Sequence, residues 1–105
     1  MARLMVLVSP PHHLGLEEAE HWLREELAPV TAGAGVRSAA LSRLAAASRR
    51  WSQEWGWLIE LEFEDAQAAR EAVAEDACRM LLGDLRLVGM RPTVALVDGA
   101  EQLEA

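Results

Sequence analysis

The 105-residue sequence predicts an α+β domain in which one antiparallel four-stranded sheet carries two helices on one face. Three observations predict this fold. Hydrophobic residues make up 51% of the chain, enough for one core in a domain of this length. From Trp55 to Glu64, side chains alternate between two faces with the period of two that is typical of a β-strand. Two other segments repeat apolar residues every three or four positions, the spacing of amphipathic helices.

The chain begins with a short apolar run, residues 3–8, which we expect to be a strand buried on both faces and therefore central in the sheet. Pro10 and Pro11 stop this strand because proline cannot donate to a β-ladder. The loop that follows, residues 10–15, carries His12 and His13.

The first helix is expected from Leu16 to about Ala28, on an apolar stripe formed by Ala19, Leu23 and Leu27 with neighbouring apolar residues. Acidic residues crowd its first turns, where the helix dipole favours negative charge. Pro29 disfavours helical angles in the residue before it, so we expect the helix to end or bend there.

Residues 36–44 are ambiguous, since their alanines and leucines favour a helix by intrinsic propensity. Gly33 and Gly35 before them, and a clear strand after them, instead favour a hairpin-like excursion. We therefore expect a strand over Val36–Leu44 and a loop over residues 45–53, which holds Arg49 and Arg50.

The strongest strand signal divides its side chains cleanly. One face carries Trp55, Trp57, Ile59, Leu61 and Phe63, and the other carries Gly56, Leu58, Glu60, Glu62 and Glu64. Aromatic and branched residues are typical of strands, so this segment, with Trp51 just before it, is the expected centre of the fold.

A second helix is expected from Ala66 to about Leu81, with Asp65 as its cap and Gly83 as its end. Its inner stripe is predicted to be Ala69, Ala72, Val73, Ala77, Met80 and Leu81. Residues 84–89 connect it to the last strand, Pro92–Val97, whose leading proline indicates a sheet edge. We expect residues 1–98 to form a single domain and residues 99–105 a C-terminal tail.

The order strand, helix, strand, strand, helix, strand is the split βαβ, or ferredoxin-like, arrangement, with the first and third strands central. Two helices cover only one face of such a sheet, and the first strand offers apolar side chains to the other face. Because large exposed apolar patches are uncommon on monomers, we expect a homodimer that pairs these sheets.

Two segments carry a family resemblance. The run LEEAEHWLREELAPV, residues 16–30, followed by a glycine turn and Val36, resembles the first helix of EthD-like proteins of the dimeric α/β-barrel superfamily. The run GWLIELEFEDAQAAR, residues 56–70, is similar to that group's third strand and the start of its second helix. With the element order, the likeness spans about nine-tenths of the chain. Leu27 stands where family members tend to have a histidine, so that histidine's role is not carried over.

The resemblance implies a barrel of two sheets, with one cavity per protomer that binds a small organic molecule, aromatic ones included. Relatives include cofactor-independent monooxygenases, cyclases, isomerases and haem-degrading enzymes, so the fold alone does not fix a reaction. We expect no cofactor, and haem least of all, because the second helix lacks the histidine that haem-degrading relatives use. The alternative is a non-catalytic accessory or interaction module.

Several residues are candidates for a site, each with a plainer alternative. His12 or His13 is a candidate general base, and the alternative is an exposed polar loop. Trp55 and Trp57 can stack on an aromatic ligand, but also fit a core or a dimer interface. Cys78 fits a packed side chain, and His21 beside acidic residues fits a solvated surface, so no metal site is expected.

Charged residues on two neighbouring strands form a second candidate group. Arg37 and Arg43 share one side of their strand, where they could meet Glu60 and Glu62 across the sheet. If this face lines the barrel, the cavity is polar and suits an oxygenated ligand. If it faces solvent, the same residues form an ordinary ion-pair surface.

Charge and composition exclude several classes of function. The net charge of −7 argues against nucleic acid and anionic membranes as partners. The chain has no lysine and no tyrosine, which excludes Schiff-base lysine and tyrosine acid catalysis. The only cysteine cannot form an internal disulfide, and no segment resembles a signal peptide, so we expect a cytoplasmic protein. The Ala, Arg, Gly and Leu bias hints at a bacterial source.

Overall fold

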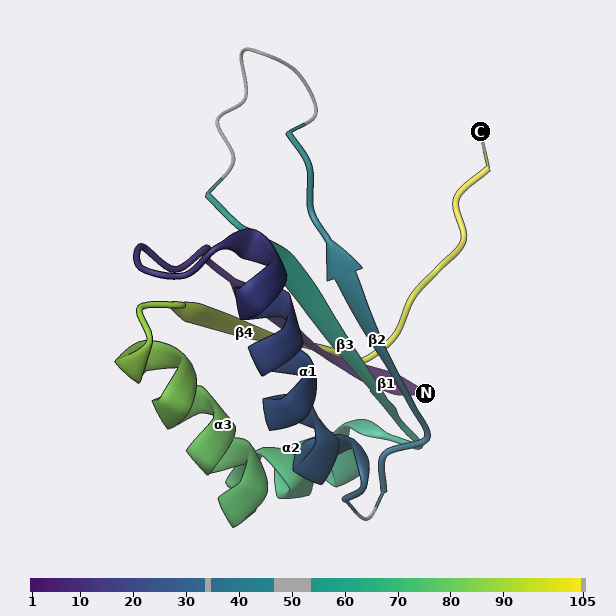
Figure 1. Ribbon diagram of the computed structural model, residues 1–105. Helices are drawn as coiled ribbons and strands as arrows, with labels where there is room; N and C mark the ends of the chain where they lie inside the picture. Colours follow the sequence, from purple (N-terminus) through teal and green to yellow (C-terminus); the bar gives the residue numbers. More distant parts are fainter. Residues whose placement is uncertain (34, 47–53, 105) are drawn as a thin grey trace.

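The computed structural model, which describes residues 1–33, 35–46 and 54–104, has the predicted ferredoxin-like α+β architecture. Within these described residues, four strands and three helices follow one another (Figure 1). Their bounds are β1 Ala2–Val8, α1 Leu16–Thr31, β2 Ser38–Arg43, β3 Trp57–Phe63, α2 Ala66–Ala74, α3 Asp76–Leu87 and β4 Pro92–Val97.

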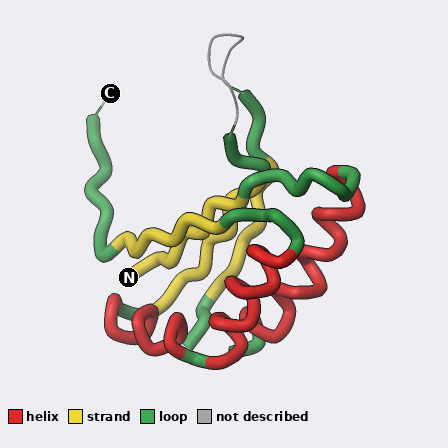
Figure 2. The backbone as a smooth tube through the Cα atoms, turned by 90° about the vertical axis from the view of Figure 1, so that its left-hand side faces the viewer, coloured by secondary structure: helices red, strands yellow, loops and turns green. Residues whose placement is uncertain are grey.

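The strands form one antiparallel sheet in the order β2-β3-β1-β4, so β1 and β3 are central and β4 lies at an edge, as predicted. The three described helices lie on the same face of this sheet, and within the described ranges no helix covers the opposite face (Figure 2). The register aligns Leu7 of β1 with Leu58 of β3, and Arg43 of β2 with Trp57 of β3.

The core lies between the sheet and the helices, and β3 supplies its centre. Trp57, Ile59, Leu61 and Phe63 are each at most 2% exposed, which confirms the alternation read from the sequence. The strand itself begins at Trp57, so Trp55 precedes it, and Trp51 falls outside the described residues.

The prediction that β1 is buried on both faces is wrong for the single chain. Leu4, Val6 and Val8 are buried under the helices, whereas on the other face Met5 and Leu7 are only half-buried. We call that second surface the outer sheet face. By register it comprises Arg3, Met5, Leu7, Ser38, Ala40, Ser42, Leu58, Glu60, Glu62, Thr93, Ala95 and Val97.

Helix α1 continues past the expected end and includes Pro29. Proline lacks the N–H that would bond to the carbonyl of Glu25 in the turn before it. Because Pro29 is exposed, water can hydrate that carbonyl, and the helix closes two residues later with the Ala32 N–H donating to the Ala28 carbonyl at 3.1 Å.

The single second helix predicted over Ala66–Leu81 is in fact two helices. Glu75 adopts an extended conformation (φ −72°, ψ 152°) between α2 and α3. The break turns a different face of α3 to the core, so Met80, predicted to be inside, is 66% exposed while Cys78 is buried. Asp65 caps α2 as expected, and its side chain accepts from the Ala68 N–H at 2.8 Å.

The predicted end at Gly83 is also wrong, because α3 runs through Gly83 to Leu87. A glycine inside a helix costs only about 1 kcal/mol relative to alanine, and the buried Leu85 just beyond it extends the apolar stripe. The chain leaves the helix just beyond Leu87, at Gly89, which has a positive φ of 79°. There the Met90 N–H donates to the Leu85 carbonyl at 2.8 Å, which satisfies an end carbonyl that would otherwise lack a partner.

Outside these elements, β2 lies within the predicted Val36–Leu44, and most of the predicted loop 45–53 falls outside the described residues. Residues 98–104 form neither helix nor strand, and they lead away from the sheet (Figure 1). None of the helices in the described ranges is long and apolar enough to cross a membrane.

Candidate functional site

A buried carboxylate marks the site. Glu20 lies in the second turn of α1, on the side that also carries the core residues Leu23 and Leu27, and it is only 9% exposed. An ionised carboxylate taken out of water is costly unless charged or hydrogen-bonding groups surround it.

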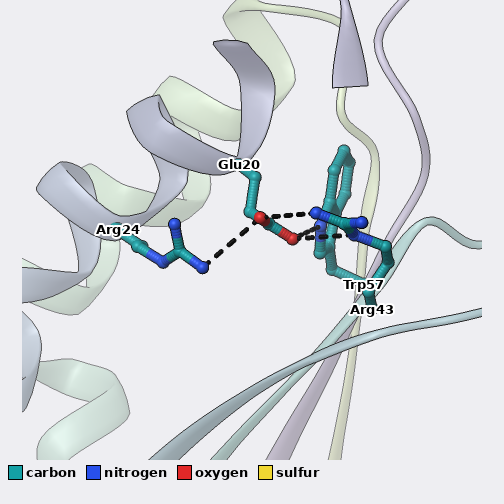
Figure 3. A network of polar contacts seen from close by, with 4 residues as sticks. All are labelled: Glu20, Arg24, Arg43 and Trp57. Atoms are coloured by element: carbon teal, nitrogen blue, oxygen red, sulfur yellow. Dashed lines mark hydrogen bonds and ion pairs between the residues drawn. The ribbon is translucent and has the colours of Figure 1, made fainter. Parts of the chain in front are cut away.

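Three side chains surround Glu20, and we call the four residues together the Glu20 cluster (Figure 3). Arg43 of β2 binds the carboxylate through two nitrogens, Nη2 to Oε2 at 2.8 Å and Nε to Oε1 at 3.1 Å. The indole N–H of Trp57 donates to Oε1 at 3.1 Å, and Arg24 Nη2 donates to Oε2 at 3.3 Å. Each carboxylate oxygen therefore accepts two donors, which uses the four acceptor positions of a carboxylate.

These contacts fix the protonation of the cluster. The hydrogen bonds from Arg43 and then from Trp57 lower the pKa of Glu20 from its ordinary 4.5 to about 2, and they outweigh the opposing effect of burial. The hydrogen bond with Glu20 raises the pKa of Arg43 in turn. Glu20 is thus a permanent anion near neutral pH. It cannot exchange protons with a substrate there, and its role is to orient Arg43 and Trp57.

Two hollows border the Glu20 cluster on the helix side of the sheet. The Trp57 hollow has a volume of about 300 Å³ and is lined by Pro10, Leu16, Arg43, Leu44, Gly56 and Trp57. The α1–β2 hollow has a volume of about 250 Å³ and is lined by Arg24, Leu27, Ala28, Thr31, Ala39, Ala40, Leu41, Ile59 and Leu61. Arg24 thus borders one hollow and Arg43 the other, and both bind the same carboxylate.

The loop after β1 forms one wall of the Trp57 hollow, and Gly56 lets it approach. A Cβ at Gly56 would lie 3.3 Å from Cγ of Pro10, closer than most side-chain contacts allow. The Gly56 N–H also donates to the Val8 carbonyl at 2.7 Å, which joins the start of β3 to the end of β1. Glycine at position 56 therefore permits the close approach of Pro10 to the start of β3.

Of the predicted site residues, the structure brings Arg43 and Trp57 together. Both line the Trp57 hollow and both bind Glu20. His12 and His13 lie exposed in the loop that also supplies Pro10, with their rings edge-to-face and their centroids 6.5 Å apart. Neither histidine is among the described residues that line the two hollows.

The expected pairing of Arg43 with the glutamates of β3 is wrong. Arg43 stands opposite Trp57 and points to the helix side, where it binds Glu20. On the outer sheet face, Glu60 instead binds Arg3 at 3.2 Å, and Glu62 accepts from the Ser38 hydroxyl at 3.4 Å. Arg37, just before β2, meets Glu62 through its backbone N–H, which donates to the Glu62 carbonyl at 2.8 Å.

The remaining candidates are not members of the Glu20 cluster. Trp55 is half-buried before β3, and His21 pairs with Glu25 at 2.9 Å on an exposed face of α1. Burial raises the pKa of the Cys78 thiol, as befits a packed side chain. Within the described part of the chain, no three His, Cys, Asp or Glu residues gather closely enough to hold a metal ion.

Sequence reasoning missed Glu20 and Arg24. A signal for Glu20 was present, because residues 20, 23, 27 and 30 recur at helical spacing, which puts an acidic residue on the apolar stripe of α1. Such a residue predicts a buried carboxylate with cationic partners. Arg24 follows one turn later and so can reach the same carboxylate.

Acid should weaken the fold through the Glu20 cluster. Because the folded pKa of Glu20 is depressed, its stabilising contribution is complete above about 4.5 and is lost as the pH falls toward about 2. Glu20→Gln should therefore have a lower melting temperature than the wild type at neutral pH. The difference between the two melting temperatures should shrink as the pH falls from about 4.5 to about 2. Thermal unfolding followed by circular dichroism from neutral pH down to about 2 checks it.

Arg43→Gln provides the matched variant, because Arg43 is the main cause of the depressed pKa. The melting temperature of Arg43→Gln should also lie below that of the wild type at neutral pH, and this difference should shrink over the same pH interval. A Glu20→Gln deficit that stays constant down to pH 2 would contradict the assignment.

The fold and the one-sided helical layer define a ferredoxin-like α+β protein with a candidate site between α1 and the β2–β3 side of the sheet. Solved structures include similar proteins, and the predicted resemblance to EthD proteins is confirmed among them. An EthD family protein from Bacillus halodurans is 19% identical, with a TM-score of 0.72 over 97% of this chain and 99% of that one. A scan of family models and a search of curated proteins both found no match.

Two further structures show how varied the similar proteins are. SnoaB from Streptomyces nogalater, a cofactor-independent oxygenase, is 16% identical, with a TM-score of 0.69 over 99% of this chain and 97% of SnoaB. A dimeric ferredoxin-like protein of unknown function from Thermobifida fusca is 10% identical, with a TM-score of 0.67 over 92% of this chain and 89% of that one. At these identities the likeness shows the fold alone.

Proposed function

We propose that this protein binds a small organic molecule, aromatic ones included, in the Trp57 hollow. The observation that carries the proposal is the pairing of Trp57 and Arg43 on the wall of that hollow, both held by Glu20. The exposed guanidinium of Arg43 offers directed donors at this concave surface. The buried indole of Trp57 and the apolar Leu16 complete the wall, and apolar walls with a few placed polar groups are typical of small-molecule sites. Prior orientation by Glu20 lowers the entropy that binding would otherwise cost.

We further propose a cofactor-independent oxidation or isomerisation, with His12 or His13 as the general base. Both histidines lie in the loop that supplies Pro10 to the wall of the hollow, and Glu20 is held ionised by its partners. A neutral imidazole is suited to remove a proton from an acidic carbon or hydroxyl near neutral pH. SnoaB, described as a cofactor-independent oxygenase, shares the fold and so supports this class of chemistry.

The second candidate is a binding or accessory module without catalysis. The exposure of both histidines, outside the described lining of the hollow, favours it. Enzymatic turnover of a bound compound separates the two candidates, because a module without catalysis would bind the compound but leave it unchanged. His12→Gln/His13→Gln should abolish that turnover if a histidine is the base, and turnover that survives the double substitution rejects the catalytic role.

We also propose that the working form is a homodimer joined through the outer sheet face, in the cytoplasm of a bacterium. The half-buried Met5, Leu7 and Leu58 support the dimer, as does the dimeric ferredoxin-like protein from Thermobifida fusca. Pairing of the two outer sheet faces would enclose Glu60 and Glu62 in a polar lumen. A ligand in that lumen would contact these two residues. The lone, buried thiol of Cys78 suits a reducing compartment.

A fragment screen by ligand-observed NMR tests the site. Leu16 lines the Trp57 hollow and is 58% exposed, so Leu16→Trp should fill the hollow without disturbing the core. Fragments that bind the wild type should lose most of their signal with this variant. Leu87→Trp, on α3 at a position 84% exposed, is the matched control and should keep the signal. Binding that survives Leu16→Trp would place the ligand elsewhere.

A further inference from the structure

The α1–β2 hollow is distinct from the proposed site and has different chemistry. Its walls are aliphatic, formed by Leu27, Leu41, Ile59 and Leu61, whereas the Trp57 hollow has an aromatic wall. Ile59 and Leu61 are buried core residues of β3, so packed apolar side chains form the floor of the α1–β2 hollow. Such a surface favours a short aliphatic chain by burial of apolar area.

Arg24 is the charged group on the wall of this hollow. It makes the longest hydrogen bond of the Glu20 cluster, 3.3 Å to an oxygen that already accepts from Arg43 at 2.8 Å. One carboxylate charge is thus shared by two guanidinium groups, and the bidentate partner takes the larger share. Arg24 keeps a partly uncompensated positive charge, in a chain whose net charge is −7.

The Arg24 guanidinium also has donors left over. A guanidinium offers five N–H donors, and the hydrogen bond to Glu20 engages one nitrogen, Nη2. The side chain is 65% exposed, so it can turn toward a ligand in the hollow without unfolding the helix. The charge of Glu17 also raises the pKa of Arg43, but Glu17 is exposed. Water therefore screens its charge.

We propose that the α1–β2 hollow is a second binding site, which takes a small aliphatic carboxylate with its chain between α1 and β2 and its charge on Arg24. The apolar part displaces water from Leu27, Leu41 and Ile59, and the carboxylate receives the guanidinium donors that Glu20 does not use. A planar guanidinium matches a carboxylate through two parallel hydrogen bonds. This second site does not depend on ligand binding in the Trp57 hollow, so the two proposals can be tested separately.

Titration with hexanoate and with its neutral isostere hexanamide, followed through backbone amide NMR shifts of the whole protein, tests the proposal. Hexanoate should shift the amides of Ala28, Ala39 and Leu41 and bind about tenfold more tightly than hexanamide, the gain expected from a charge-assisted hydrogen bond. Arg24→Gln should remove this preference.

Arg3→Gln is the matched control, because Arg3 makes a similar ion pair, 3.2 Å to Glu60, on the outer sheet face. It should keep the tenfold preference. Ala39→Phe, which fills the hollow from an exposed position on β2, should abolish binding of both compounds. Equal affinity for hexanoate and hexanamide overturns the proposal, as do shifts confined to Leu44 and Gly56 of the Trp57 hollow, or no shifts at all.

Discussion

Trp57→Ala is expected to lower the free energy of unfolding by about 3–5 kcal/mol, the range measured for large aromatic side chains removed from cores. Trp57 is 1% exposed and is among the largest fully buried side chains of the described chain. Its loss removes apolar contacts and also one of the two donors to Oε1 of Glu20. Since small domains have a total stability of about 5–15 kcal/mol, this loss is a large fraction of the whole. Urea denaturation measures the change.

Trp57→Phe separates packing from hydrogen bonding, because it keeps a buried ring but removes the indole N–H. It should cost about 1.5–3 kcal/mol, the range for a hydrogen bond to a charged group. Trp55→Ala, at the half-buried position two residues earlier, is the comparison for tryptophan removal in general. A Trp57→Ala cost no larger than that of Trp55→Ala would show that Trp57 does not anchor the core.

Leu58→Arg on the outer sheet face is expected to convert the proposed homodimer into a monomer. Leu58 stands opposite Leu7 in the register, and together they form the apolar end of that face. Burying an unpaired guanidinium there should weaken association by roughly 30-fold or more, equivalent to a hot-spot loss of about 2 kcal/mol. In the monomer the new charge would lie near Glu60, two residues along the same face, so the fold should tolerate it. Light scattering at micromolar concentration measures the change of mass.

Leu87→Arg is the matched control for this experiment, since Leu87 is an apolar residue 84% exposed on α3, on the helical side of the molecule. It should leave the dimer intact. A wild type that is already a monomer would refute the homodimer, and a dimer broken only by Leu87→Arg would place the interface on the helices instead.

The elements of this fold were largely predictable because each depends on local periodicity. The alternation around Ile59 and Leu61 and the stripe through Leu23 and Leu27 identified the third strand and the first helix, and both are observed. Helix ends were less predictable. Pro29 and Gly83 are unfavourable in helices, but packing of the neighbouring apolar residues decides whether a helix continues through them.

The candidate site depended on a register that the sequence does not encode locally. Arg37 and Arg43 were predicted to share one side of their strand, but which residues of β3 they meet depends on the register between the two strands. A slip of one residue would move Arg43 from the helix side to the outer sheet face. The observed register aligns Arg43 with Trp57, and so brings both within reach of Glu20, which lies 37 residues before Trp57.

The sequence by itself determined the class of fold and the buried face of β3, and it also carried the overlooked signal of an acidic residue on the apolar stripe of α1. These follow from side-chain periods that any local segment displays. Only the tertiary structure decided that Glu20, Arg24, Arg43 and Trp57 meet, and that two hollows border them. A buried charge must find partners, but the partners are chosen by strand register and helix packing, which are properties of the assembled chain.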